Sequence, residues 1–131
     1  MEITVRVSET DMLGHVNHAN YFTYMEEARI NYLKELGIKI NNKGCTIVLA
    51  SATCDFIRQA FSEDVLLIDT YVKKVGQRSF TLGNDIVDKQ SEQLIARGEL
   101  VIVYFDMDKQ KSADIPGEIK EKLTEKIEQR H

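Results

Sequence analysis

The sequence predicts an α+β fold in which one long helix is wrapped by a curved antiparallel sheet. Apolar residues recur at helical spacing near the N-terminus and again at the C-terminus. Most of the chain between these stretches divides into segments rich in β-branched and apolar residues, joined by short polar turns, so that neighbouring strands run antiparallel. Because one helix cannot cover both faces of a five-stranded sheet, the sheet is expected to curve around it.

The first elements follow from local patterns. Glu2–Ser8 alternates strictly between polar and apolar residues, which predicts a strand. The helical spacing that follows predicts a central helix over Ala19–Leu36. Asn17 and Asn20 are both suited to cap its N-terminus, and Gly37 is suited to end it.

The rest of the chain predicts a sheet followed by a tail. The polar stretch Ile38–Gly44 predicts a loop. Residues 1–116 are expected to form the domain, and 117–131 an amphipathic C-terminal helix or tail, in which apolar residues recur every fourth position over 119–127. We expect this helix to dock loosely on the domain or to fray, with a partner-binding role as the alternative. The four further strands are predicted over Thr46–Arg58, Asp64–Val75, Ser79–Val87 and Gln93–Phe105.

Composition limits the classes of function. A chain of 131 residues with 43% hydrophobic residues fits one domain with a real core. Its net charge of −4 argues against a nucleic-acid partner, and no apolar run approaches the ~20 residues of a membrane span. Cys45 and Cys54 are expected to be reduced core residues, which is typical of a cytoplasmic protein, with a disulfide or metal role as the alternative.

The turn before the central helix gathers the reactive side chains of the chain. Asp11, His15, Asn17, His18 and Asn20 lie within ten positions. Four of them also have a purely structural interpretation: the aspartate as a turn residue, the two asparagines as helix caps and His15 as a packing residue. The carboxylate and the two imidazoles could instead bind a metal, although their spacing is not the i, i+4 pair of helical zinc sites.

The same turn carries a family resemblance. The string Asp11-x-x-Gly14-His15-Val16-Asn17-His18-Ala19-Asn20-Tyr21, the continuation to Arg29 with Glu26, and the strand order resemble the hotdog-fold acyl-CoA thioesterases of the 4-hydroxybenzoyl-CoA thioesterase and YbgC-like type. The resemblance extends from Ile3 to about Pro116. It implies a hotdog fold, to which the apolar spacing of the tail adds a C-terminal helix. It also implies homodimers, often paired into tetramers as dimers of dimers, with the active site at the dimer interface.

The resemblance also assigns roles to individual residues. It implies that Asp11 is the catalytic carboxylate, that His18 occupies a position commonly held by histidine, and that amides at the helix start polarise the thioester carbonyl. The His-Val-Asn string is shared with the acyl-carrier-protein thioesterases. In that branch an asparagine lies two residues after the aspartate, where this chain has Leu13. The catalytic set of that branch therefore does not transfer directly.

Thioester hydrolysis fits these residue types. One carboxylate can suffice, since a thiolate leaves easily. Asp11 would act as general base on water or as nucleophile on the carbonyl carbon. The amides of His18–Asn20, at the positive end of the helix dipole, would hold the oxyanion. His18 would orient the reacting groups or pass a proton, and Asn17 would bond the thioester or fix the turn.

Further residues are expected to bind the substrate. His15, Ala19 and Tyr21 would contact it at the turn and the first helical residues, although a core role suits Tyr21 equally. Arg58, Lys74 and Arg78 would contact the phosphates of coenzyme A, since guanidinium groups suit phosphate. For each basic residue the structural alternative is a solvated strand end or hairpin tip.

The predicted function is hydrolysis of an acyl-CoA to a carboxylic acid and free coenzyme A, with no metal and no organic cofactor. Two alternatives remain open: an acyl-carrier-protein thioesterase, and a hotdog protein that binds acyl-CoA without turnover. Ranking carrier-protein against CoA substrates by kcat/KM separates the first alternative. Binding without thiol release identifies the second.

Overall fold

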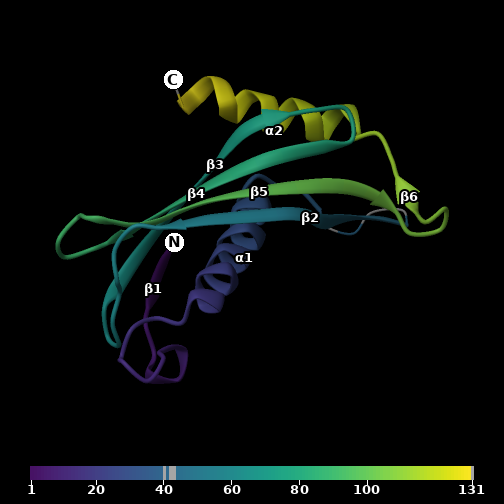
Figure 1. The fold of residues 1–131 in the computed structure, drawn as a ribbon. Helices are drawn as coiled ribbons and strands as arrows, with labels where there is room; N and C mark the ends of the chain where they lie inside the picture. The colour runs from purple at the N-terminus through teal and green to yellow at the C-terminus, as the bar shows by residue number, and fades with distance from the viewer. Residues whose placement is uncertain (40, 42–43, 131) are drawn as a thin grey trace.

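The computed structural model describes residues 1–39, 41 and 44–130. Its antiparallel sheet has the strand order β1-β3-β4-β5-β2, with a short strand, β6, added to β5. The helix α1 lies against the curved sheet, and α2 lies near β3 (Figure 1). In chain order the elements are β1 (Glu2–Thr4), the 3-10 helix η1 (Val7–Glu9), α1 (His18–Glu35), β2 (Cys45–Phe56), β3 (Val65–Val75), β4 (Ser79–Asp88), β5 (Leu94–Asp106), β6 (Lys111–Ser112) and α2 (Gly117–Arg130).

The ends of α1 are set by local chemistry. The Asn17 side-chain oxygen accepts a hydrogen bond from Ala19 N at 3.0 Å, which confirms this asparagine as the N-cap. After the helix, Gly37 adopts a positive φ of 75°, a conformation that glycine reaches without strain. The predicted helix therefore differs from α1 by one residue at each end.

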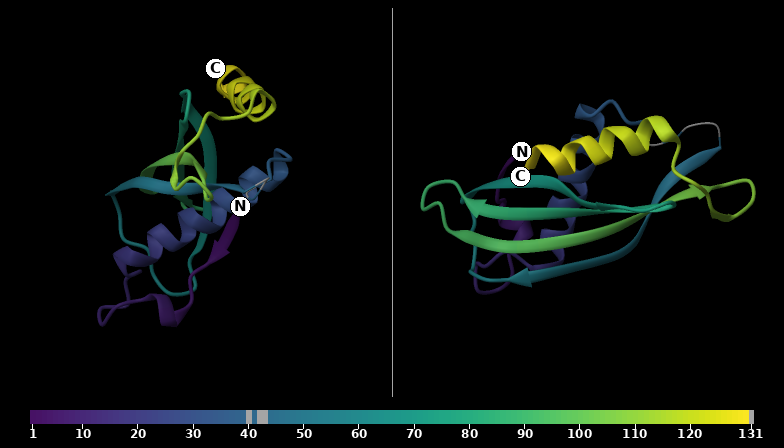
Figure 2. Two further views of the ribbon diagram at one scale, coloured as in Figure 1. Left: turned by 90° about the vertical axis from the view of Figure 1, so that its right-hand side faces the viewer. Right: turned by 90° about the horizontal axis from the view of Figure 1, so that it is seen from above.

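The core forms between α1 and the sheet. Tyr24, Met25 and Leu33 on α1 are fully buried in one apolar cluster with residues from β3, β4 and β5. A Cβ at Gly98 of β5 would overlap Met25 Sδ, so this glycine allows the close approach of the helix to the sheet. The two views of Figure 2 show the curvature that lets the sheet surround α1.

The first strand is shorter than predicted. The chain pairs with β3 only over Glu2–Thr4 and then enters η1. The reason is a local bonding pattern, in which the Glu9 carboxylate accepts hydrogen bonds from Arg6 N at 2.9 Å and from the Arg6 guanidinium at 2.8 Å. This pattern bends the backbone where polar–apolar alternation alone predicts that the strand continues.

The C-terminal helix packs closely on the domain. Leu123 of α2 is 0% exposed and belongs to the same apolar cluster as Leu33 of α1 and Val72 of β3. Ile119 and Ile127 are partly buried against that cluster. The predicted apolar stripe is therefore confirmed, whereas the expectation of loose docking was wrong because the stripe completes the main core.

The remaining strands agree with prediction to within a few residues. β2 begins at Cys45 and ends at Phe56, and the predicted hairpin between β3 and β4 closes with a hydrogen bond from Gly76 N to Ser79 O at 2.7 Å. Within the expected loop Ile38–Gly44, residues 40, 42 and 43 lie outside the described residues. Over the part of the chain that is described, neither helix is long and apolar enough to cross a membrane.

Candidate active site

Asp11 lies on a narrow hairpin between η1 and α1. Thr10 and Val16 form an antiparallel bridge, and Asp11 N donates to His15 O at 2.7 Å. On one side of the hairpin, Val16 N donates to Ala60 O at 2.8 Å and ties it to the segment before β3. Gly14 at the tip has a positive φ of 81°, which lets the chain reverse direction within a few residues.

The Asp11 carboxylate is held by one oxygen only. Its Oδ1 accepts hydrogen bonds from Leu13 N at 2.9 Å and His15 N at 3.2 Å. Its Oδ2 has no hydrogen-bond partner among the described residues, and the side chain is exposed in the single chain. The turn thus fixes the carboxylate while leaving one oxygen available to a water molecule or a substrate.

The first amides of α1 differ in availability. Ala19 N donates to the Asn17 side chain, and Asn20 N donates to Asn17 O at 2.9 Å. Within the described part of the chain, His18 N has no acceptor. Of the amides expected to hold an oxyanion, His18 N–H is therefore the one that remains available, at the positive end of an 18-residue helix.

Asn17 acts as a cap in the structure, since its side-chain oxygen is already occupied by Ala19 N. Ala19 itself is exposed on the first turn of the helix. The capping role was one of the two alternatives for Asn17, and the oxygen that performs it is unavailable to substrate.

The His18 ring lines a small cavity beside the helix start. The cavity has a volume of about 100 Å³, and the ring stacks on Phe56 with centroids 4.3 Å apart. Tyr21 also contacts Phe56, at 5.4 Å between ring centroids. The described residues lining the cavity are His18, Tyr21, Phe56, Ile57, Arg58 and Gln59.

Tyr21 serves both the core and this cavity. Its side chain is almost fully buried, and burial raises its pKa to about 12, partly offset by hydrogen bonding to the Ala60 backbone. The phenol therefore stays protonated near neutral pH. It can form part of the wall of an acyl pocket but is a poor proton acceptor.

His15 packs against the domain. Its ring meets Phe61 edge-to-face at 5.0 Å between centroids, and the two residues form a backbone bridge. His15 and His18 thus rest on different phenylalanines. Across the described chain, no three His, Cys, Asp or Glu side chains are grouped so as to hold a metal ion.

The basic residues expected at the substrate do not lie together in one chain. Arg58 lines the cavity, and its backbone N donates to Ile95 O. Arg78 lies beside Tyr104, whose N donates to Arg78 O. Ile95 and Tyr104 are nine residues apart on β5, which corresponds to ~30 Å along a strand. Lys74 belongs to the same distant hairpin end, so the pairing register separates residues that the sequence pattern grouped.

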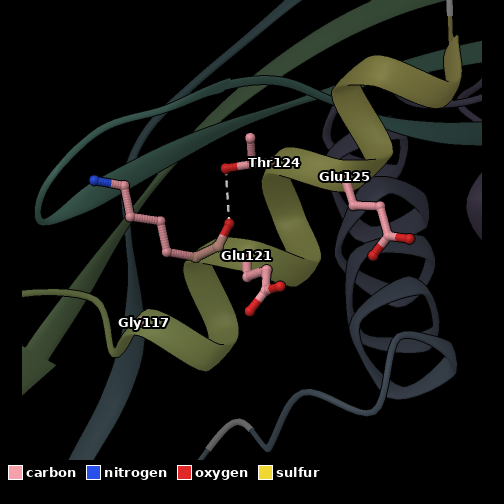
Figure 3. Close-up of a pocket in the computed structure, with 5 residues that line it drawn as sticks. Gly117, Glu121, Thr124 and Glu125 are labelled. Carbon is pink, nitrogen blue, oxygen red and sulfur yellow. Dashed lines mark hydrogen bonds between the residues drawn. The ribbon is translucent and has the colours of Figure 1, made fainter.

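A larger cavity of about 520 Å³ lies along α2, far along the chain from the turn. Figure 3 shows the described residues that line it, with the Thr124 hydroxyl donating to Lys120 O at 2.8 Å. Its described lining comes from α2 alone and has no histidine, cysteine or aromatic side chain: Gly117, Lys120, Glu121, Thr124 and Glu125. The chemistry of the chain therefore concentrates at the Asp11 hairpin and not at the larger cavity.

Comparison with known proteins identifies the family of this chain independently of the site geometry. The family model described as the thioesterase-like superfamily matches residues 5–123. The Bacillus subtilis protein YsmA is 36% identical over 122 residues, which cover 93% of this chain and 82% of YsmA. The long-chain acyl-CoA thioesterase FadM of Escherichia coli is 27% identical over 128 residues, which cover 96% of this chain and 97% of FadM.

Solved structures give the same fold. The crystal structure of a 1,4-dihydroxy-2-naphthoyl-CoA thioesterase from Synechocystis superposes with a TM-score of 0.84 at 23% identity. The match covers 97% of this chain and 93% of that chain.

Proposed function

This chain belongs to the thioesterase-like superfamily and has the hotdog fold, and from that premise we propose that it is an acyl-CoA thioesterase. The reaction adds water to the thioester carbonyl carbon, breaks the carbon–sulfur bond, and releases a carboxylic acid and the thiol of coenzyme A. The activity named for FadM supports this assignment. We propose that the reaction needs neither a metal nor an organic cofactor.

One observation carries the proposal. The hairpin holds Asp11 by Oδ1 and leaves Oδ2 without a partner in the described chain. Seven residues later, at the start of α1, the His18 amide also has no acceptor there. A free carboxylate oxygen on the hairpin and a free amide hydrogen at the start of the helix that follows it are what attack on a thioester carbonyl requires.

In the proposed reaction, Asp11 Oδ2 takes a proton from water as the water attacks the carbonyl carbon. In the alternative, Oδ2 attacks that carbon directly and water then hydrolyses the resulting anhydride. The two routes remain alternatives. In both, the carbonyl oxygen becomes an anion stabilised by His18 N–H and the helix dipole, and the thiolate leaves and takes up a proton.

The cavity beside the helix start is a candidate binding site for the substrate atoms near the thioester. The His18 ring is fixed there by stacking on Phe56, where it can orient the carbonyl or the water. Arg58 lines the same cavity and is the basic residue best placed for the phosphates of coenzyme A.

A second copy of the chain would bring the separated basic residues closer. β2 ends the strand order, so its outer edge has no partner within the described chain, and Leu49 at its centre is 44% exposed. Pairing two β2 edges about a twofold axis would extend the sheet and place the Cys45 end of one chain beside the Phe56 end of the other. The hairpin with Lys74 and Arg78 of the second copy would then lie toward Arg58. We therefore propose a homodimer, which in turn can pair into a tetramer.

We place the protein in the cytoplasm. Cys45 and Cys54 are both free in the structure, in keeping with a reducing compartment.

The test is to supply short, long and aromatic acyl-CoAs, and the same acyl groups on acyl carrier protein, and to follow thiol release. We expect turnover of at least one acyl-CoA. Faster kcat/KM on the carrier protein would indicate the acyl-carrier-protein alternative. Binding without thiol release, or no response to any of these substrates, would overturn the assignment as an acyl-CoA thioesterase.

A further inference from the structure

Glu9 is a buried carboxylate for which the proposed reaction has no use. It is the last residue of η1, two positions before Asp11, and it is only 8% exposed. Sequence patterns missed it, because the alternation of Glu2–Ser8 gives no reason to bury the carboxylate that follows. A buried charge persists only where its oxygens are bonded, so its partners indicate its role.

The Glu9 carboxylate joins η1 to the second turn of α1. Oε1 accepts a hydrogen bond from the buried Tyr24 hydroxyl at 2.9 Å and another from Arg6 N. Oε2 accepts from the Arg6 guanidinium at 2.8 Å. Burial raises the pKa of the Tyr24 phenol, and the bond to Glu9 raises it further, so the hydroxyl keeps the proton that it donates.

The Glu9 main chain binds the start of the same helix. Its carbonyl oxygen accepts from Asn17 N at 2.8 Å and from the Asn20 side chain at 3.0 Å. Asn17, Asn20 and Tyr24 are spaced at i, i+3 and i+7, which places them along one face of a helix. One residue therefore attaches the base of the Asp11 hairpin to the helix at three points.

These contacts connect the two segments that carry the reacting groups, the Asp11 carboxylate and the His18 amide. Glu9 lies opposite Asn17 in the hairpin, with Asp11 two residues beyond Glu9 and His18 one residue beyond Asn17. We propose that Glu9, through Tyr24, is a positioning residue that sets the distance between the Asp11 carboxylate and His18 N–H. The inference rests on the proposed function and identifies what holds its geometry.

The direct test is Tyr24→Phe, which removes the hydroxyl and keeps the ring. Because a small misplacement of reacting groups can reduce rate by up to ~100-fold, we expect kcat to fall about 10- to 100-fold with little change in KM. Glu9→Gln should give the same pattern, since the side-chain NH2 of glutamine would face an Arg6 donor in place of an accepting carboxylate oxygen. Tyr71→Phe is the matched control, because it removes a tyrosine bond to a carboxylate, Asp85, that lies away from the hairpin.

Two further readouts separate positioning from a purely structural role. In an Asp11→Asn background, Tyr24→Phe should lower the residual rate no further, because its effect passes through Asp11. Amide hydrogen exchange of residues 10–18 should speed up about 10- to 100-fold in Tyr24→Phe, the size expected for loss of a bond to a charged group, and should not change in Tyr71→Phe.

The outcomes distinguish this inference from the proposed function. If Tyr24→Phe keeps the wild-type kcat, or exchange in the hairpin does not change, the positioning role is wrong even when the wild type is an active thioesterase. If the wild type turns over no acyl-CoA but exchange in the hairpin rises as expected, the hairpin is held as described and the proposed function fails instead.

Discussion

At the scale of single residues, the site depends on how few atoms are left without partners. Asp11 uses one carboxylate oxygen to hold its turn, and Asn17 uses its side-chain oxygen to cap α1. Of the atoms proposed to take part in the reaction, Asp11 Oδ2 and His18 N–H have no hydrogen-bond partner in the described part of the chain. Neither atom costs stability, because the exposed site lets water satisfy both until substrate replaces it.

The Glu9 carboxylate should make stability depend on acid pH. Burial raises its pKa, but hydrogen bonds from Arg6 and Tyr24 lower it by more, so the folded pKa lies below the ordinary value. The stabilisation is then full above the unfolded pKa of ~4.3 and is lost as pH falls through the lower folded value.

Urea unfolding of the wild type and Glu9→Gln at pH 7, 5 and 3.5 measures this effect. At pH 7 the variant should be less stable by about 1–3 kcal/mol, because a buried acceptor of several donors is impaired. That difference should shrink toward pH 3.5. A difference that stays constant with pH would mean that the charge on Glu9 does not stabilise the fold.

Residue-scale roles could be predicted only where they depend on near neighbours in sequence. The Asn17 cap follows from short-range chemistry and was predicted. The burial of Glu9 depends on a contact with Tyr24, fifteen residues away, that no periodicity encodes. Likewise, which amide of His18–Asn20 stays available depends on where the Asn17 side chain turns.

At the scale of elements, the approach of α1 to β5 sets the position of the helix start. Gly98 lies beneath Met25, and an added Cβ would overlap Met25 Sδ. Gly98→Ala should destabilise the fold by about 1–3 kcal/mol through overpacking, as measured by thermal or urea unfolding.

Gly117→Ala is the matched control, because a Cβ there meets nothing within 4 Å. It should leave stability unchanged or slightly improved, since alanine favours a helix more than glycine does. In a Met25→Ala background, Gly98→Ala should cost less stability than it does in the wild type, because the Sδ atom that the added Cβ would overlap is absent. Equal effects of the two glycine variants would contradict the close-approach account.

Elements were the most predictable level of this chain. The apolar spacing of α1 and the polar turns between strands identified all the long elements. The error in β1 has a local cause, the bonding of Arg6 to Glu9. The error in the docking of α2 has a tertiary cause, because a thin apolar stripe gives no indication of the gap that Leu123 fills.

At the scale of the whole molecule, the unpaired edge of β2 predicts association. Leu49→Glu would place like charges near each other across a twofold pairing of β2 edges, so the variant should be monomeric. Light scattering should give about twice the chain mass of 15.0 kDa, or a multiple of it, for the wild type, and the chain mass for Leu49→Glu.

Leu67→Glu provides the control, since Leu67 is 38% exposed and lies on β3, which is paired on both sides. It should keep the wild-type mass. If Leu49→Glu also keeps the wild-type mass, β2 is not the interface. The sequence grouped Arg58 with Lys74 and Arg78, but the register of β5 separates them, and only an assembly can bring them together.

Asp11 Oδ2 is proposed to act as the general base or the nucleophile at the start of α1. Single-turnover hydrolysis of an acyl-CoA by Asp11→Asn tests it most directly, with Asp106→Asn as a control, because Asp106 also accepts two backbone amides of its own turn, at the other end of the sheet. We predict that Asp11→Asn lowers the rate about 100- to 10,000-fold, the range of general acid–base catalysis, while Asp106→Asn keeps it. A wild-type rate in Asp11→Asn would contradict the account.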